Sequence, residues 1–266
     1  MEKFLYGMSW GNDLRIPADR IMISAASFWD PKKKEFVLPN LLSNPVEIGL
    51  DCGGFVCQQK WDGFPYSVQE YTNYADEFIE AFPQTSFVSV MDLPCEPDVN
   101  RGTFASNVER IQYTVRNTCE CLAHPLRGSA VWLPVVQGYL PWEYSFCVQE
   151  MRRTGCLRPW MAIGSICQRK GTKGVKMVIQ HVRQELPPET RLHTFGLQLS
   201  ALKDPEIKSI VYSSDSGAWK FKSGCTNGKW RPTGYKEKLE NFLAYRLKIE
   251  EMILGDFRYR NLVEGI

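Results

Sequence analysis

Long hydrophobic runs are absent from this sequence of 266 residues. No stretch approaches the ~18 consecutive apolar residues from which a membrane-spanning helix is built. The start of the chain, MEKFLYGMSWGNDLRIP, also lacks the basic region and apolar run of a secretory signal. We therefore expect a cytoplasmic protein without a membrane partner.

The sequence also lacks the features of a disulfide framework, a fibrous repeat or a disordered chain. Its 9 cysteines are an odd number scattered through a chain without a secretion signal, which predicts free thiols in a reducing compartment. A content of 44% hydrophobic and 23% charged residues is ordinary for a globular chain. We find no repeat or linker and expect a single domain over residues 1–266, close to the roughly 250 residues of one α/β barrel.

Charge is distributed unevenly along the chain. Residues 1–150 carry 11 Lys and Arg against 19 Asp and Glu, whereas residues 151–266 carry 21 against 11. The basic half is a candidate surface for a polyanion such as nucleic acid, although solvated helix faces would explain either of its clusters alone. The candidate nucleic-acid contacts are Arg152, Arg153, Arg169, Lys170, Lys173, Lys220, Lys222, Lys229 and Arg231.

Seven short apolar runs rich in β-branched residues alternate with segments of helical spacing. Such alternation predicts a parallel sheet covered by helices. We expect an α/β fold, a TIM-type (β/α)8 barrel rather than an open doubly wound sheet, with the eighth strand in residues 218–223 or irregular. The seven runs are 20–28, 46–51, 86–92, 130–137, 160–164, 192–196 and 209–215.

Three segments have the apolar spacing of amphipathic helices. Ser67 and Glu70 form a capping-box pattern before the first, which extends to Phe82. The second apolar stripe runs from Phe104 to Leu122, and the third predicts a C-terminal helix over about residues 235–254.

The carboxyl ends of the expected strands carry polar or small residues. In a parallel barrel these ends meet at one mouth, where the active site lies. Three carboxylates there would repel one another, so the set favours a function over the turn and capping roles that would explain each Asp alone. A pair of carboxylates flanking a sugar carbon is the arrangement that breaks glycosidic bonds. The strand-end residues are Asp51, Asp92, Gln137, Gly164, Gly196 and Asp215.

Residues beside these positions suit a flat, purine-like ligand. Gly53 and Gly54 allow the backbone to approach a ring closely, and Phe55 offers a stacking face. Phe195 is expected to cover the opposite face of the ring. Groups suited to the polar edge of a purine come from Gln137, Gly138 and Gly164.

Six segments spread between about residues 46 and 219 carry a family resemblance. They are DCGGF (51–55), MDLPCEP (91–97), VVQG (135–138), AIG (162–164), FG (195–196) and SSDSGAW (213–219). In this order they resemble the tRNA-guanine transglycosylase superfamily. The details are most similar to its DNA-acting branch, the DpdA-like DNA-guanine transglycosylases of phages and bacteria.

The resemblance implies a role for each catalytic carboxylate. Asp215 occupies the place of the nucleophile that attacks C1′ of the nucleotide, and Asp51 the place of the general acid/base. The implied reaction is a double displacement, in which guanine leaves and a 7-deazaguanine such as 7-cyano-7-deazaguanine takes its place. The partner would be double-stranded DNA, whose target nucleotide is flipped out of the stack, in the host cytoplasm if the chain is phage-encoded. The reaction needs no cofactor.

The resemblance also implies how the base is bound. Asp92 would accept hydrogen bonds from the guanine-like N1–H and exocyclic amine. Gln137 and the Gly164 backbone, with Gly138 beside them, would read the O6 side. Phe55 and Phe195 would sandwich the ring.

The sequence departs from the tRNA enzymes in its metal ligands. Those enzymes carry a zinc subdomain after the nucleophile, with a cysteine cluster and a later histidine. Here only Cys225 follows Asp215, and the last histidine is His193, so the sequence excludes a zinc site of that type. Cys119 and Cys121 are two residues apart and do not face each other on a helix, so we expect no metal site elsewhere.

Three alternatives stay open. A tRNA-guanine transglycosylase with a reduced body is opposed by the missing zinc cluster. A non-catalytic accessory subunit that binds nucleic acid is opposed by the retained carboxylates Asp51, Asp92 and Asp215. A barrel glycoside hydrolase acting on small sugars would leave the basic half of the chain unexplained.

Overall fold

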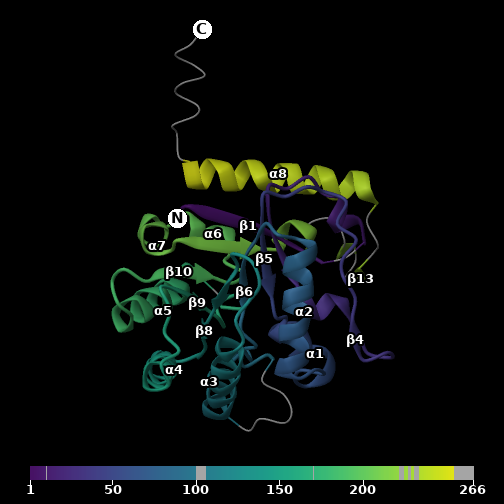
Figure 1. Cartoon of the computed structure of the whole chain (residues 1–266). Coiled ribbons are helices and arrows are strands. Elements are labelled where there is room, and N and C mark those ends of the chain that lie inside the picture. The colour runs from purple at the N-terminus through teal and green to yellow at the C-terminus, as the bar shows by residue number, and fades with distance from the viewer. Residues whose placement is uncertain are drawn as a thin grey trace.

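The computed structural model describes residues 1–9, 11–99, 106–169, 171–221, 225–226, 229–230 and 234–254. Its centre is a nearly closed parallel barrel in which nine strands follow the order β7-β6-β5-β2-β1-β11-β10-β9-β8. The fold is therefore the expected TIM-like α/β barrel (Figure 1). The strands are β1 (Lys3–Met8), β2 (Arg20–Ser24), β5 (Glu47–Asp51), β6 (Thr85–Ser89), β7 (Val131–Leu133), β8 (Val135–Val136), β9 (Trp160–Ile163), β10 (Arg191–Thr194) and β11 (Ser213–Ser216).

The one seam in the hydrogen-bonded barrel lies between β7 and β8, which are consecutive in sequence. Only Pro134 separates them, and proline has no backbone N–H with which to continue a ladder. β7 pairs with β6 and β8 pairs with β9, so the two short strands together occupy the place of one barrel strand. The Pro134 carbonyl still accepts a 2.8 Å hydrogen bond from the Ala162 N–H.

Helices cover the outside of the barrel, and among the described residues none is long and apolar enough to cross a membrane. Figure 1 shows them around the strands, with α8 along one side. They are α1 (Gly54–Trp61), α2 (Val68–Ala81), α3 (Asn107–Ala123), α4 (Pro141–Arg153), α5 (Thr172–Glu185), α6 (Leu199–Leu202), α7 (Pro205–Ile210) and α8 (Tyr235–Leu254). Shorter elements are the 3-10 turns η1 (Gly11–Arg15), η2 (Ala25–Phe28) and η3 (Ala218–Phe221), and the hairpins β3–β4 (Trp29–Asp30, Glu35–Phe36) and β12–β13 (Cys225–Thr226, Lys229–Trp230).

Local sequence signals located the long helices well. The Ser67 side chain caps α2 by accepting a hydrogen bond from the Glu70 N–H. The Glu70 side chain in turn accepts from the Ser67 N–H, as the capping box predicts. A second capping box, between Ser106 and Glu109, begins α3. Phe104, the first member of the second expected stripe, lies outside the described residues. The expected C-terminal helix is α8.

The eighth strand position is not where the sequence suggested. All seven expected runs overlap barrel strands, but residues 218–221 form η3 and residues 222–223 lie outside the described part. The missing strand is β1, which pairs with β2 on one side and β11 on the other. Trp219 of η3 is fully buried and donates from its indole N–H to the Gly7 carbonyl, so this segment packs against β1 instead of extending the sheet.

The outer face of β1 is covered by a helix from the C-terminal part of the chain. Only the short turn η1 joins β1 to β2, so no sequential helix packs on β1. The helix α8 supplies this cover, with ring centroids 4.9 Å apart for Tyr6 and Phe242 and 6.4 Å apart for Phe4 and Tyr245. The C-terminal helix thereby completes the outer layer of the barrel.

Candidate active site

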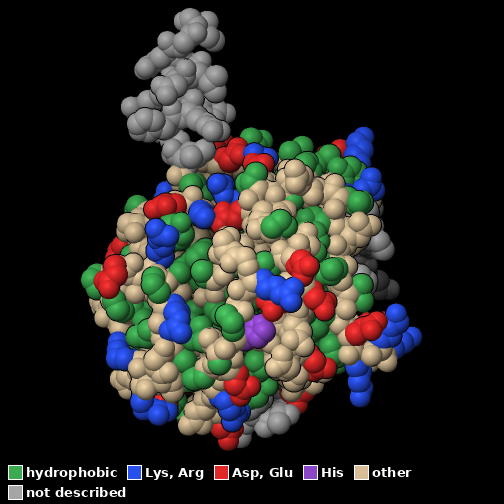
Figure 2. All heavy atoms as spheres, in the orientation of Figure 1, with side chains coloured by type: hydrophobic (Ala, Val, Ile, Leu, Met, Phe, Trp, Pro, Cys, Tyr) green, Lys and Arg blue, Asp and Glu red, His purple; other side chains and the backbone are tan. Residues whose placement is uncertain are grey.

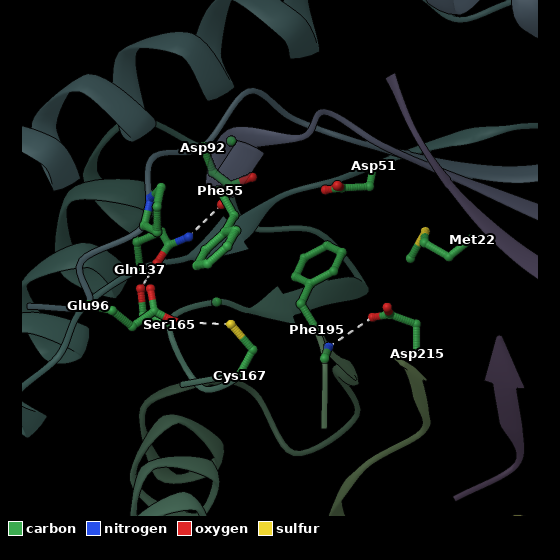
Figure 3. A pocket seen from close by; sticks show the side chains of 14 residues that line it. Met22, Asp51, Phe55, Asp92, Glu96, Gln137, Ser165, Cys167, Phe195 and Asp215 are labelled. Atoms are coloured by element: carbon green, nitrogen blue, oxygen red, sulfur yellow. Dashed lines mark hydrogen bonds between the residues drawn. The ribbon is translucent and has the colours of Figure 1, made fainter. Parts of the chain in front are cut away.

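A cavity of about 160 Å³ opens at the carboxyl ends of the barrel strands (Figure 3). This volume is below the ~300–1,000 Å³ of pockets for drug-sized ligands, so it suits one small ring system. Seven of the eight residues expected to act on or bind a base line it, namely Asp51, Phe55, Asp92, Gln137, Gly164, Phe195 and Asp215. The eighth, Gly138, does not line the cavity, because it packs against the first turn of α4 at Tyr144.

Asp51 ends β5 and faces two other carboxylates. Burial and, to a smaller extent, the nearby charges of Asp92 and Asp215 raise its pKa to about 7, while the Gly53 N–H donates to Asp51 Oδ2 at 3.1 Å. A carboxyl group with a pKa near neutrality can both give and take a proton at physiological pH. Asp51 therefore has the properties of a general acid/base.

Asp215 lies on β11 at another side of the same cavity. Its Oδ1 atom accepts a 3.0 Å hydrogen bond from the Gly196 N–H, which fixes the carboxylate at the cavity wall. Figure 3 shows Asp215 and Asp51 on separate walls of the cavity. This arrangement leaves room for a group bound between the two carboxylates.

Asp92 lies three residues after β6 and is 7% exposed. Burial raises its pKa to about 6, while hydrogen bonds from Cys52 and Gln137 oppose the shift. The Cys52 thiol donates to Asp92 Oδ1 at 3.2 Å, and burial raises the pKa of this thiol well above its usual value. Cys52 thus stays protonated and orients Asp92 from behind the cavity wall.

The Gln137 side chain makes two hydrogen bonds within the cavity wall. Its Nε2 donates to Asp92 Oδ2, and its Oε1 accepts from the Ser165 hydroxyl at 2.5 Å. Gly164 is required beside it, because a Cβ there would overlap the Gln137 amide. The amide, the glycine backbone and Asp92 thus form a continuous polar edge.

Two phenyl rings flank this polar edge. Phe55 comes from the first turn of α1, and Phe195 directly follows β10 (Figure 3). The turn before Phe55 needs both of its glycines: Gly53 has φ of 81°, and a Cβ on Gly54 would overlap the Asp92 carbonyl oxygen. The DCGGF segment therefore brings Asp51 and Phe55 into the cavity through a turn that bulkier residues would disrupt.

His193 is a contact of Asp215 that the sequence did not reveal. It is fully buried on β10, where Nδ1 lies 2.9 Å from the Ser213 hydroxyl and Nε2 lies 3.4 Å from Asp215 Oδ1. Nε2 has no aligned hydrogen-bond partner within the described part of the chain. The strand register that pairs His193 with Ser213 is what brings the ring to Asp215.

Glu96 and Cys167 also line the cavity, and neither was singled out from the sequence. Glu96 is 1% exposed, and its Oε1 accepts from the Cys167 thiol at 3.3 Å. Its Oε2 atom is buried without a hydrogen-bond partner among the described residues. Its place within the MDLPCEP segment was the only available signal, and that signal does not show which way the side chain points.

The described ranges hold one group of possible metal ligands. There, Asp51, Cys52 and Asp92 are the only group of three whose ligand atoms lie within 4.8 Å of one another. The protonated Cys52 thiol donates to Asp92, so this group is arranged for hydrogen bonding and does not fit a metal well. Cys119 and His124 take separate partners, Cys156 Sγ at 3.1 Å and Asp76 Oδ2 at 2.9 Å.

Two of the expected nucleic-acid contacts lie away from the cavity in the described part of the chain. Arg152 and Arg153 end α4 at the opposite end of the barrel from the cavity, where Arg152 donates to the carbonyl of Glu185 at the end of α5. Figure 2 likewise shows Lys and Arg dispersed among acidic and apolar side chains on the face that it displays. These two arginines are therefore poorly placed to contact a nucleotide at the mouth.

The remaining basic residues differ in how available they are. Arg169 and Lys173 follow β9 near the mouth, but the Arg169 guanidinium already stacks on Tyr139 at 4.4 Å and donates to the Ser165 carbonyl. Lys173 is exposed. The Lys220 amine donates to Ser9 Oγ at 2.8 Å, and burial lowers its pKa. Lys170, Lys222, Arg231 and the side chain of Lys229 lie outside the described residues.

Fold and cavity together define a TIM-like barrel whose strand-end carboxylates and aromatic side chains enclose a site for one small ring. Residues 36–255 match the model of the DpdA family, DeoxyPurine in DNA protein A, and the chain belongs to this family. Membership confirms the resemblance to the DNA-acting branch and implies a DNA-guanine transglycosylase role in deoxypurine modification. No curated protein matches the chain.

Proposed function

We propose that this protein exchanges guanine in double-stranded DNA for a 7-deazaguanine base, of which 7-cyano-7-deazaguanine is the simplest candidate. The observation that carries the proposal is the set of three carboxylates, Asp51, Asp92 and Asp215, around one ring-sized cavity in a chain of the DpdA family. The family supplies DNA as the substrate, and the cavity supplies groups suited to a double displacement.

In the first half of the reaction, an Asp215 carboxylate oxygen attacks C1′ of the flipped nucleotide. The C1′–N9 bond breaks, and guanine leaves with a proton from Asp51, whose pKa of about 7 keeps the protonated form available. In the second half, Asp51 takes the N9 proton of the incoming base, which attacks C1′ and releases Asp215. Two inversions retain the configuration of the sugar.

The same cavity accounts for base selection in this proposal. Asp92 accepts from the N1–H and exocyclic amine of the base, once Gln137 Nε2 has turned from Asp92 toward O6. The Gly164 backbone lies beside that amide. The rings of Phe55 and Phe195 cover the faces of the base, which replaces part of the stacking lost on flipping.

The test is mass spectrometry of nucleosides from duplex DNA incubated with the protein and 7-cyano-7-deazaguanine. We expect a modified deoxynucleoside with wild-type protein and none with Asp215→Ala. The variant with Glu47→Gln, at the opposite end of the barrel, is the matched control and should retain activity.

A parallel incubation with tRNA distinguishes our proposal from the main alternative, an enzyme that acts on tRNA. Incorporation of the base into tRNA but not into DNA would replace our proposal with a tRNA-guanine transglycosylase. Exchange that survives Asp215→Ala would remove Asp215 as the nucleophile. Binding of DNA without exchange of any base would favour a non-catalytic accessory role.

A further inference from the structure

Two cysteines outside the cavity lie in direct contact with each other. Cys119 is near the carboxyl end of α3, Cys156 follows α4, and their Sγ atoms are 3.1 Å apart. The two residues are 37 positions apart in the sequence, so the packing of α3 against α4 is what brings them together (Figure 1). Both helices begin after the carboxyl end of a barrel strand and run back, which places the pair at the opposite end of the barrel from the cavity.

The position of Cys156 is fixed by the turn that ends α4. The Gly155 N–H donates to the Arg152 carbonyl at 3.2 Å, and the Cys156 N–H donates to the Met151 carbonyl at 2.8 Å. Gly155 has φ of 70°, so the turn is a Schellman motif, in which a residue in the left-handed conformation ends the helix. The Thr154 hydroxyl also donates to Cys156 Sγ at 3.3 Å. Backbone geometry therefore holds this sulfur against α3.

The two thiols differ in how easily an oxidant reaches them. Cys156 is 2% exposed, and burial raises its pKa to about 11. Cys119 is half-buried, and the charge of Arg153, which pairs with Glu150, acts on its thiol. Oxidants attack the accessible thiol of a pair first, and the second thiol then completes the disulfide. We therefore expect Cys119 to react first and Cys156 to act as the resolving thiol.

The pair also lies beside the seam of the barrel. α3 precedes β7 and α4 follows β8, and these two strands border the seam. A covalent link between Cys119 and Cys156 would join the helices on either side of the seam from outside the sheet. It would also close a loop across 37 positions, which restricts the unfolded chain and thereby stabilises the folded one.

We propose that Cys119 and Cys156 are a redox-sensitive pair that hydrogen peroxide converts to a disulfide, and that this disulfide braces the barrel at its seam. The Cys119 thiolate attacks a peroxide oxygen, the O–O bond breaks, and a sulfenic acid and water form. The Cys156 sulfur then attacks the sulfenic sulfur, the S–S bond forms, and a second water leaves with the Cys156 proton. Together the thiols give two electrons to the peroxide, and a dithiol reductant reverses the change.

The test begins with the full-length protein treated with hydrogen peroxide. Remaining thiols are alkylated, and a non-reduced digest is analysed by mass spectrometry. We expect two peptides linked through Cys119 and Cys156, and we expect dithiothreitol to remove the link. Absence of this link, or oxidation that ends at a sulfinic acid on Cys119, would overturn the proposal.

Cys119→Ala and its matched control Cys121→Ala distinguish the pair from general oxidation of thiols. Both residues are on α3, but Cys121 is fully buried, and burial raises its pKa to about 12. Cys119→Ala should remove the link to Cys156, whereas Cys121→Ala should retain it. A disulfide at Cys156 that persists in Cys119→Ala would assign the oxidation to another thiol and overturn the proposal. The digest of the wild-type protein decides the pairing even if a variant does not fold.

Thermal unfolding tests whether the link braces the fold. Oxidised wild-type protein should melt about 5–10 °C above the reduced protein, the shift expected for a cross-link over a loop of this length. Cys119→Ala should melt at the same temperature before and after peroxide. Equal melting temperatures for linked and reduced wild type would overturn the bracing role. Because the pair is remote from the cavity, a protein that forms the link but exchanges no base in either state would contradict the proposed function alone.

Discussion

The two ends of strand β5 carry buried carboxylates with opposite environments. Glu47, at the amino end, lies 2.8 Å from Lys3 Nζ and 3.1 Å from Arg20 Nε. Although burial acts to raise its pKa, the hydrogen bond from Lys3 and the charges of Lys3 and Arg20 outweigh burial and lower it. Asp51, at the carboxyl end, faces carboxylates, and burial with their charges raises its pKa to about 7.

This difference separates stability from function within five residues of one strand. The amino end of the barrel neutralises its buried charge with cations, as a structural site does. The carboxyl end gathers like charges that burial penalises, which is typical of a site whose task is chemistry or binding. Variants at the two ends should therefore affect activity and stability in opposite ways.

The largest effect is expected at Asp215. Asp215→Asn removes the proposed nucleophile while keeping the hydrogen-bond geometry, so exchange should fall at least about a thousandfold. Single-turnover incorporation of labelled base into duplex DNA measures this loss. A modest decrease would show that another group attacks C1′.

Asp51→Asn should sharpen the contrast, because it lowers activity and raises stability. Loss of proton transfer should slow exchange by roughly 10²–10⁴-fold and remove the pH dependence centred near pH 7. The pH–rate profiles of wild type and variant measure both effects. If the rate of the variant still changes near pH 7, another residue acts as the general acid/base.

The stability change at Asp51 follows from the sign of its pKa shift. The folded-state pKa of about 7 lies above the unfolded value of ~3.9, so ionisation weakens the fold progressively as pH rises between these values. At pH 8 the Asp51→Asn variant should be more stable than wild type by up to about 4 kcal/mol, with little difference near pH 3. Urea unfolding at both pH values is the measurement, and a destabilised variant at pH 8 would contradict the assigned environment.

His193→Phe tests whether the contact between His193 and Asp215 contributes to the reaction. The phenyl ring fills the space among Phe87 and Phe195 but cannot donate to the carboxylate 3.4 Å away. We expect kcat to fall roughly tenfold with KM for the base unchanged, because the polar contact of Nε2 with the Asp215 carboxylate is lost. His181→Phe, a partly exposed position on α5, is the control, and equal losses in both variants would argue for a general packing effect.

Glu47→Gln should have the smallest effect, and on stability alone. The lowered pKa of Glu47 contributes stability that is present above the unfolded value of ~4.3 and is lost as pH falls through the folded value. At pH 7 the variant should lose about 1–2 kcal/mol of unfolding free energy with exchange unchanged, and near pH 3 it should approach wild type. Impaired exchange in a folded variant would show that the two barrel ends are coupled.

Features determined by neighbours in the chain could be predicted from the sequence. The Ser67–Glu70 capping box located α2, and alternating strands and helices identified the barrel. Asp51 and Asp215 could be predicted as members of one site, because parallel strands bring their carboxyl ends to the same mouth whatever the details of packing.

Features that depend on register or on distant segments were missed. β1 has no sequential helix to complete the alternating pattern, since its cover comes from α8. His193 reaches Asp215 only through the pairing of β10 with β11. Arg152 and Arg153 lie at the far end of the barrel because α4 runs away from the mouth, and counts of charge along the sequence do not include this direction.

The sequence by itself determined the fold class, the strand-end carboxylates and the family, because strand alternation and ordered motifs are local properties of the chain. Only the tertiary structure decided the protonation behaviour of Asp51 and the contact of His193 with Asp215. These properties depend on burial and on distances between strands far apart in sequence. Electrostatic energy changes steeply with both, so no linear pattern encodes it.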